Sequence, residues 1–504
     1  MFIRTGSLEP VLVLASLLVL GLVAWLLSRR VVNPHQELEP EDASAKLAAA
    51  FLIKPYLQLG DRPHLLAAEA VDLFWHSTLV VRTWSVQVRS AGATSWRSCA
   101  PVASSAFNVK GIASSIRHRA VLDGLTPGAV FDYRVLADGM IAFSGSGRAR
   151  NAVDQPYNFA VIGDLGYVRD KREQRMAHQL SVTNPDMLFV AGDIVYERGR
   201  VSEYLRDFFP SYNPDQSNPE TGGPVLRSVI TLGNPGNHDV GLPNAQDSRN
   251  FSEHPDLLGY FLFWSQPLNG PLGTVGGANT PNLIGDLASQ ESFLNKAGDA
   301  FPRMANYSFQ WGNSYWIVLD SNAYMDWSDP QLLAWLEAEL TIAQGSTWLF
   351  VSFHHPVFSS DGKHVNEQRM RLLCPLFEKY NVDVVFTGHN HCYERTHPVR
   401  FAPYFSKVAI NTENCPVPGD FTIDTAYDGI TNTHPNGVIY LVDGAGGAKF
   451  YPELQPSKSG LKPFTARYDQ SVNSFTHCHV DGRKFVARQL SHNGEEIDRF
   501  EIAK

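Results

Sequence analysis

The sequence predicts an α/β domain preceded by a small all-β domain. Residues 51–150 alternate apolar and polar side chains with a period of two and contain Gly/Pro turns, which is typical of strands. From Asn151 onward, short apolar runs alternate with segments whose apolar residues recur at helical spacing. This alternation is typical of α/β domains. We therefore divide the chain into segments 1–30, 31–50, 51–150 and 151–504.

The composition indicates a protein of more than one domain and excludes several classes of protein. The chain has 504 residues, of which 44% are hydrophobic, enough for two or three domains with their own cores. Its formal net charge of -9 lacks the excess of positive charge that is typical of nucleic-acid-binding proteins. The 5 cysteines form no C-x-x-C pair, which excludes a disulfide scaffold and a zinc ribbon.

Residues 11–27, VLVLASLLVLGLVAWLL, form an uncharged apolar run at the short end of the length of a membrane span. No small-x-small cleavage site follows, so we expect an uncleaved signal anchor rather than a removed signal peptide. A buried soluble helix is the alternative. Arg4 and the amino terminus balance Arg29 and Arg30, so the positive-inside rule leaves the orientation open. We interpret residues 31–50 as a tether.

The clearest strands of the all-β region are VDLFWHSTLVVRTWSVQVRS and VFDYRVLADGMIAFSG. Residues 122–128, LDGLTPG, resemble a turn of a fibronectin-III-like sandwich. The region holds no cluster of catalytic residue types, so we expect a structural or docking domain.

In the α/β region, parallel strands should dominate. Strand-like runs occupy 157–163, 186–192, 225–233, 314–320, 348–353 and 382–388, and helical periodicity marks 169–182, 330–343 and 366–380. Antiparallel strands are expected near the C-terminus, in GVIYLVDG, SFTHCHVDG, KFVARQLS and DRFEIA. Residues 241–305, rich in Gly, Asn, Pro and aromatic residues, interrupt the pattern and indicate a lid, a binding loop or disorder.

Residue types that commonly bind metals follow five of the strand-like runs. In α/β sheets, ligands usually bind at the carboxyl ends of the strands. Taken singly, each has a structural explanation as a turn aspartate, a helix cap or a core histidine. Together they favour a metal site. The five stretches are Gly163-Asp164-Leu165-Gly166, Gly192-Asp193-Ile194-Val195-Tyr196, Gly236-Asn237-His238-Asp239, Val351-Ser352-Phe353-His354 and Gly388-His389-Asn390-His391.

This mixture of oxygen and nitrogen ligands suits iron, zinc or manganese. A bridging carboxylate holds two such ions about 3.5–4 Å apart, a geometry suited to phosphate esters.

The order and identity of these residues resemble the purple acid phosphatases, a branch of the calcineurin-like metallophosphoesterases. Two details carry the resemblance to this branch: Tyr196, and the run Gly388-His389-Asn390-His391-Cys392-Tyr393-Glu394-Arg395, which is similar to the family's G-H-x-H-x-Y-E-R. The resemblance implies an α/β metallophosphoesterase sandwich, two β-sheets flanked by helices, at 151–504. It agrees with a fibronectin-III-like β-sandwich at 51–150. Residues 241–305 match no part of the family pattern.

The resemblance also implies roles for individual residues. Asp193 would bridge the two ions, and His238 and His364 would contact phosphate and protonate the leaving alkoxide. The family is variable at the position of His355, which we interpret as a non-ligand that packs against Pro356. The ferric ion would be bound by Asp164, Tyr196 and His391, and the divalent zinc, iron or manganese ion by Asn237, His354 and His389.

The expected function is hydrolysis of small phosphate monoesters by metal-bound hydroxide, with histidine as general acid. A phosphodiesterase or nucleotide hydrolase on the same centre, with 241–305 binding the second ester group, is one alternative. A non-catalytic, membrane-tethered binding protein is another, although the full ligand set argues against it. We expect a membrane-anchored or secreted protein with its catalytic domain in the periplasm or outside the cell. The sequence does not give the oligomeric state.

Overall fold

The computed structural model describes residues 51–166, 170–241, 249–452 and 455–504. Residues from Ala50 onward form one compact unit. The expected membrane segment at 11–27 and the tether at 31–50 lie outside the described residues. In the part of the chain that the structure describes, no helix is both long enough and apolar enough to cross a bilayer.

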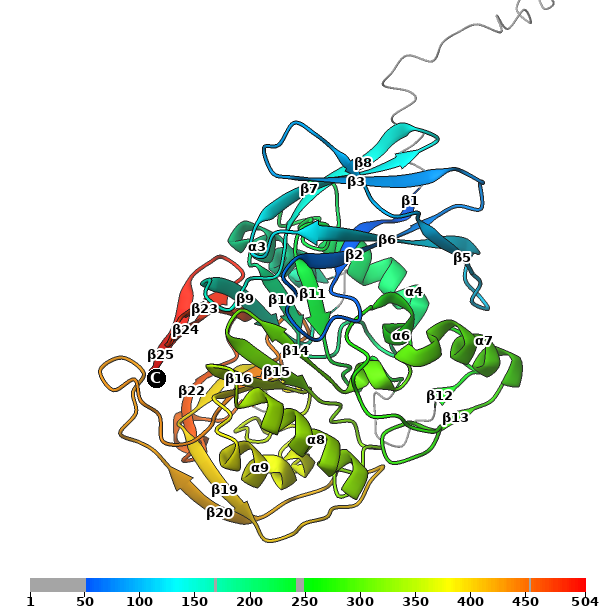
Figure 1. The fold of residues 1–504 in the computed structure, drawn as a ribbon. Helices are drawn as coiled ribbons and strands as arrows, with labels where there is room; N and C mark the ends of the chain where they lie inside the picture. Colours follow the sequence, from blue (N-terminus) through cyan, green and yellow to red (C-terminus); the bar gives the residue numbers. More distant parts are fainter. Residues whose placement is uncertain (1–50, 167–169, 242–248, 453–454) are drawn as a thin grey trace, which may run out of the picture. The chain divides into compact units, whose positions relative to one another are not determined.

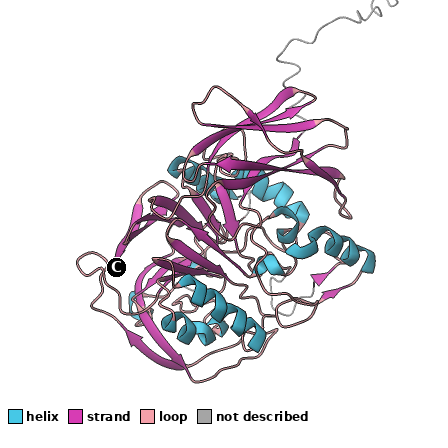
Figure 2. Cartoon of the chain, viewed as in Figure 1, coloured by secondary structure: helices cyan, strands magenta, loops and turns pink. Residues whose placement is uncertain are grey.

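The N-terminal described region is all-β, as predicted, and Figure 2 draws it as strands and loops. Its two four-stranded sheets have the orders β1-β2-β6-β5 and β4-β3-β7-β8. Leu73 and Trp75 of one sheet share a buried cluster with Val86 and Tyr133 of the other, an arrangement consistent with a fibronectin-III-like sandwich. The strands are β1 (Phe51–Gln58), β2 (Glu69–Ser77), β3 (Trp84–Ser90), β4 (Arg97–Ser98), β5 (Ala103–Phe107), β6 (Ser115–Leu125), β7 (Val130–Ala137) and β8 (Met140–Arg148).

The α/β region contains a six-stranded sheet of order β11-β10-β9-β23-β24-β25. Its first three strands are parallel, and its last three are antiparallel, as expected near the C-terminus. Its strands are β9 (Tyr157–Ile162), β10 (Met187–Val190), β11 (Ile230–Gly233), β23 (Ser474–Asp481), β24 (Lys484–Ser491) and β25 (Glu496–Ala503).

A seven-stranded sheet of order β14-β15-β16-β17-β21-β18-β22 forms the second layer. Strands β15, β16, β17 and β21 are parallel neighbours. The strands are β14 (Tyr307–Trp311), β15 (Ser314–Val318), β16 (Trp348–Ser352), β17 (Val384–Thr387), β18 (Tyr393–Thr396), β21 (Ile439–Asp443) and β22 (Thr465–Asp469). Two short pairs lie outside both sheets, β12 (Arg249–Asn250) with β13 (Leu283–Ile284), and β19 (Val399–Pro403) with β20 (Gly419–Ile423).

Aromatic side chains join the two sheets face to face. Phe159 of β9 lies 5.1 Å from Trp316 of β15, 5.6 Å from Phe350 of β16 and 5.9 Å from Phe386 of β17, measured between ring centroids. Such pairs each contribute about 0.5–1.5 kcal/mol beyond their buried area. The predicted sandwich of two sheets with flanking helices is therefore confirmed.

Helices cover the outer faces, and α8 packs on β15 (Figure 1). Helix α8 begins where its sequence signals place it, because the Asp329 side chain accepts hydrogen bonds from the backbone N–H groups of Gln331 and Leu332. The helices are α3 (Arg172–Thr183), α4 (Val201–Glu203), α5 (Phe209–Tyr212), α6 (Tyr260–Phe263), α7 (Leu287–Ala297), α8 (Pro330–Ala343) and α9 (Cys374–Lys379).

Three elements differ from their predictions. Strand β11 occupies only the end of 225–233. Helix α9 starts at Cys374 because Pro375, which lacks an N–H, fits the first turn of a helix but not its interior; residues 369–373 form a 3₁₀ turn. Strand β21, expected to be antiparallel, runs parallel to β17 and is antiparallel only to β18.

The described part of the unaligned segment packs against the all-β domain. The Tyr56 hydroxyl donates to the Phe263 carbonyl at 3.0 Å, and the Ser265 N–H donates to Gln58 Oε1 at 3.0 Å. The Tyr260 hydroxyl donates to the Gly233 carbonyl at the end of β11, which ties the segment to the six-stranded sheet. This segment therefore connects the two domains.

Candidate metal centre

The strand-end loops of both sheets meet at one edge of the sandwich. Asp164, Asp193 and Asn237 come two to four residues after β9, β10 and β11, and His354 and His389 come two residues after β16 and β17. Because parallel strands end at the same edge, these side chains converge. Tyr196 and His391 join them from the same loops. We call these seven residues the strand-end cluster.

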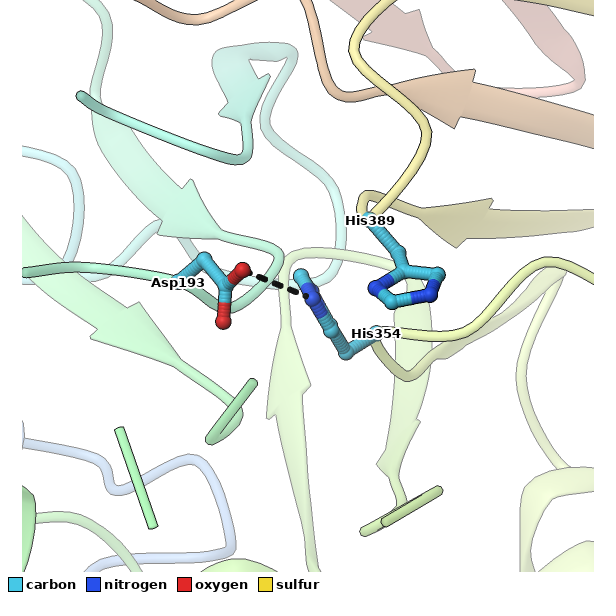
Figure 3. A group of neighbouring side chains, drawn as sticks. All are labelled: Asp193, His354 and His389. Carbon is cyan, nitrogen blue, oxygen red and sulfur yellow. Dashed lines mark ion pairs between the residues drawn. The ribbon is translucent and has the colours of Figure 1, made fainter. Parts of the chain in front are cut away.

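One half of the cluster contains an aspartate, an asparagine and two histidines. His354 Nε2 lies 3.3 Å from Asp193 Oδ2 and 3.2 Å from Asn237 Oδ1. His389 Nδ1 lies 3.1 Å from Asn237 Oδ1. Figure 3 shows Asp193, His354 and His389 turned toward one another, and their ligand atoms lie within 4.8 Å of one another. Four ligand atoms around one point suit a single cation.

The other half contains Asp164, Tyr196 and His391. The Tyr196 hydroxyl lies 3.2 Å from Asp164 Oδ1 and 3.4 Å from His391 Nε2. It also lies 3.3 Å from Asp193 Oδ2, the oxygen that faces His354. Asp193 therefore lies between the two halves, where a bridging carboxylate belongs.

Outward hydrogen bonds fix which imidazole nitrogen faces the centre. His354 Nδ1 lies 2.8 Å from the Ala191 carbonyl, and His391 Nδ1 lies 2.6 Å from the Lys449 carbonyl. A carbonyl only accepts, so each Nδ1 carries the proton and each Nε2 turns a lone pair inward. His389 Nε2 lies 3.1 Å from Glu367 Oε2, which leaves Nδ1 as its inward atom. Histidines that ligate metals are held in this way.

Glycines precede the ligands because the loops pack too closely for a side chain. A Cβ on Gly192 would lie 2.4 Å from His354 Nδ1, and one on Gly388 would lie 2.6 Å from Asp164 Oδ2. Gly192 also has φ 87°, which favours glycine. The Gly-Asp and Gly-His pairs of the sequence are therefore consequences of a compact cluster.

The cluster buries charges that compensate one another. Asp164 and His354 are fully buried and Asp193 is 1% exposed. Burial opposes the charged forms, but the Asp193 carboxylate raises the pKa of His354 to about 10, and the facing imidazoles hold the pKa of Asp193 below its ordinary value. Burial and the Asp164 carboxylate raise the pKa of Tyr196 well above its ordinary value. The inward lone pairs and carboxylates fit metal cations, which would take the place of these protons.

The two expected proton donors lie beside the cluster. His238 Nδ1 donates to the Glu197 carbonyl at 2.7 Å, and Nε2 lies 3.9 Å from Asp193 Oδ2. The His364 ring centroid lies 4.0 Å from that of His389. His355 Nδ1 is within 2.8 Å of Ser321 Oγ, and its ring packs on His389, which agrees with a packing role.

Glu367 is a site residue that sequence reasoning missed. Its carboxylate lies 2.5 Å from His364 Nδ1 and 3.1 Å from His389 Nε2, so it holds a proposed acid and a proposed ligand together. With His355 and His389 it forms a second group of potential metal ligands. Its position three residues after His364 was the only signal available.

The Tyr393-Glu394-Arg395 part of the motif lies on β18 and supports the site from behind. Glu394 accepts hydrogen bonds from Ser359 Oγ and the Ser360 N–H, at the start of the loop that carries His364. Tyr393 and Arg395 both donate to Asp498 of β25.

Comparisons with known proteins agree with this geometry. The family model described as Calcineurin-like phosphoesterase matches residues 157–393. The Fe(3+)-Zn(2+) purple acid phosphatase 12 of Arabidopsis thaliana is 27% identical over 283 residues, covering 53% of this chain and 47% of the relative. Purple acid phosphatase 15 of the same plant is 26% identical over 300 residues, covering 57% and 50%. The chain thus spans about half the length of these curated relatives.

Among solved structures, purple acid phosphatase PPD1 from yellow lupin seeds has a TM-score of 0.59 at 17% identity, covering 89% of this chain and 74% of that one. At that identity the likeness shows the shared fold. The family match, the relatives and the strand-end motifs agree with one another. Residues 157–393 therefore match the calcineurin-like phosphoesterases, and the chain is similar to the purple acid phosphatases within that group.

Proposed function

We propose that the protein hydrolyses phosphate monoesters at a dinuclear metal centre in the strand-end cluster. The observation that carries this proposal is the position of Asp193, whose Oδ2 lies 3.3 Å from His354 on one side and 3.3 Å from Tyr196 on the other. Asp164, Tyr196 and His391 would hold one ion, Asn237, His354 and His389 the other, and Asp193 both. Bound together, the ions supply a nucleophile derived from water and offset the negative charge of the phosphoryl oxygens.

Iron(III) at the tyrosine position and zinc, iron or manganese at the other are the metals we propose. The carboxylates of Asp164 and Asp193 surround the Tyr196 hydroxyl and oppose its ionisation. A highly charged ion is therefore needed to hold this side chain as a phenolate. A relative that carries Fe(3+) and Zn(2+) in its name supports the same pair.

His238 and His364 would donate a proton to the leaving alkoxide. Both lie at the rim of the cluster with side chains 18% exposed, so a substrate oxygen can reach them. His238 is oriented by the Glu197 carbonyl and His364 by the Glu367 carboxylate. A positioned imidazolium accelerates such a step by about 10²–10⁴-fold.

Metal content and phosphate release measured on one preparation test the proposal. We expect two metal ions per chain and faster turnover of phenyl phosphate than of bis(phenyl) phosphate. Faster turnover of the diester would favour a phosphodiesterase. Two bound ions with no turnover of either ester would favour the non-catalytic binding protein.

A further inference from the structure

A cavity of about 340 Å³ is lined by residues of the sheet β1-β2-β6-β5 and of the segment that carries α6 and α7. None of its lining residues belongs to the strand-end cluster. We call it the Arg117 cavity, after its central side chain. Its lining includes Phe74, Arg117, Arg119, Phe261, Trp264 and Lys296.

The register of the sheet brings two arginines to this cavity. Arg117 and Arg119 are two residues apart on β6, so their side chains leave the same face of the sheet. On the neighbouring strands, Arg117 lies opposite His76 of β2 and Ser105 of β5. The sheet therefore presents a pair of guanidinium groups to the segment that covers it.

Arg117 is a half-buried cation that forms no ion pair among the described residues. Its guanidinium lies over the Phe74 ring, 4.5 Å from the centroid, and its Nε is buried without a hydrogen-bond partner. Among the residues that the structure describes, no hydrogen bond or ion pair reaches this side chain. Burial lowers the pKa of Arg117. A charge that is partly withdrawn from water is normally paired, because an uncompensated one lowers stability.

The other polar groups leave the cavity positive. Lys296 Nζ donates to Ser292 Oγ at 2.7 Å and has no carboxylate within ion-pair distance among the described residues. Arg119 pairs with Asp72 at 2.8 Å, and Asp61 supplies the single carboxylate of the described lining. His118 stays neutral, because burial lowers its pKa to about 4. The lining thus carries three cations and one anion.

The lining also has apolar groups from the α6–α7 segment, among them Phe261, Trp264 and Met304. A volume of this size is within the range of sites that hold small organic ligands. Guanidinium groups recognise planar or tetrahedral oxyanions through paired N–H donors. A ligand with an anionic head and a flat apolar body would match both kinds of lining group.

We infer that the Arg117 cavity binds a small organic oxyanion, an aryl or similarly apolar group that carries a phosphate, phosphonate or carboxylate. The oxyanion would pair with Arg117, Arg119 and Lys296, and the apolar body would lie against Phe261 and Trp264. This second site is independent of the proposed hydrolysis. It would make the contact between the all-β domain and the α6–α7 segment depend on a ligand.

Calorimetric titration of the metal-loaded protein with phenylphosphonate tests the inference, with benzoate and inorganic phosphate as separate arms. Wild type should bind one equivalent of phenylphosphonate more than Arg117→Met, and the metal centre should account for the equivalent that remains. The benzoate arm shows whether a carboxylate suffices, and the phosphate arm whether the apolar body is needed. Equal stoichiometry and affinity in wild type and Arg117→Met for all three probes would overturn the inference.

Arg134→Met is the matched control. Arg134 lies over Trp96 at 4.4 Å, as Arg117 lies over Phe74, but on β7 of the other sheet. It should bind like wild type; loss of the extra equivalent in Arg134→Met as well would also overturn the inference. A second readout is thermal unfolding without ligand, in which Arg117→Met should be at least as stable as wild type. A lower melting temperature for Arg117→Met would show that the cation is compensated inside the protein, against the inference.

Discussion

In the strand-end cluster, buried carboxylates and imidazoles face one another at 3.3 to 3.4 Å, whereas in the Arg117 cavity a half-buried guanidinium faces an aromatic ring and open space. Both regions lie at places where separate parts of the chain meet. The first combines groups of opposite charge, and the second gathers cations.

The difference indicates what each region binds. Replacing protons by metal ions leaves the strand-end cluster compensated, because its imidazoles become neutral ligands and its carboxylates keep their charge. The Arg117 cavity reaches the same balance only by receiving an anion. A cluster whose buried carboxylates are balanced by its own imidazoles is therefore expected to bind cations. A cavity whose cations lack balancing carboxylates is expected to bind an anion.

Asp193→Ala should have the largest effect, because it removes a ligand from both proposed ions. We expect phosphate release to fall to the buffer background and the metal content to fall with it, measured by elemental analysis and a colorimetric phosphate assay. An unchanged metal content in Asp193→Ala would contradict the bridging role.

His364→Ala should lower kcat by about 10²–10⁴-fold while the metals stay bound, because the side chain lies outside the ligand set. Glu367→Gln should lower kcat less, by about 10–100-fold, since it loosens His364 and His389 without removing either. If His364→Ala loses metal, then His364 is a ligand and our assignment is wrong.

Arg150 is an arginine with a paired charge, and its contribution to stability can be compared with that of Arg117. It is fully buried, pairs with Glu69 at 3.0 Å and donates to the carbonyls of Arg62, His64 and Gln310. Arg150→Met leaves Glu69 buried and unpaired, so we expect a loss of about 3–5 kcal/mol in the free energy of unfolding. Denaturant titration measures it. If Arg150→Met lost no stability, as is expected of Arg117→Met, the contrast between compensated and uncompensated arginines would disappear.

Tyr196→Phe should remove the visible absorption of the oxidised protein and have little effect on its stability. If the phenolate binds Fe(III), oxidised wild type should show a broad visible absorption band that the variant lacks. Equal visible absorption in both proteins, at equal iron content, would exclude the tyrosinate assignment. A colourless wild type is informative only when analysis confirms bound iron.

Lys363→Met should have the smallest effect. Lys363 Nζ lies 3.6 Å from the centroid of Tyr451, whose ring stacks on His391 at 4.9 Å, so a cation stands at the rim of the cluster. Because an exposed ion pair contributes about 0.2–1 kcal/mol, kcat/KM for an ester with an anionic leaving group should fall by less than about tenfold. Esters with neutral leaving groups are the control and should be unaffected.

The sequence was informative where chemistry follows directly on a buried strand. Asp164, Asp193 and His389 each stand next to a glycine after an apolar run, so pattern and position together predicted their convergence. Glu367 follows no strand, and its contact with His389 depends on the path of an irregular loop that no local pattern encodes.

The Arg117 cavity could not be predicted for a different reason. Arg117 and Arg119 alternate with buried residues on β6, which is the pattern of a strand with one solvated face. Part of that face lines a cavity because residues from 261–304 lie against it. This segment, with a four-residue α6 and no clear periodicity, gave no sign of where it would dock.

Asp164, Asp193 and His389 have φ values of 57°, 50° and 68°, a left-handed backbone that side chains other than glycine adopt at a cost of about 1–3 kcal/mol each. The backbone is therefore strained at the three residues whose side chains are the proposed ligands. Glycine at any of them would relieve strain and remove a ligand in one step. In a library of variants selected for thermal stability alone, these three residues should be among the first to be replaced, with loss of catalysis. Retention of all three residues would indicate continued selection for turnover.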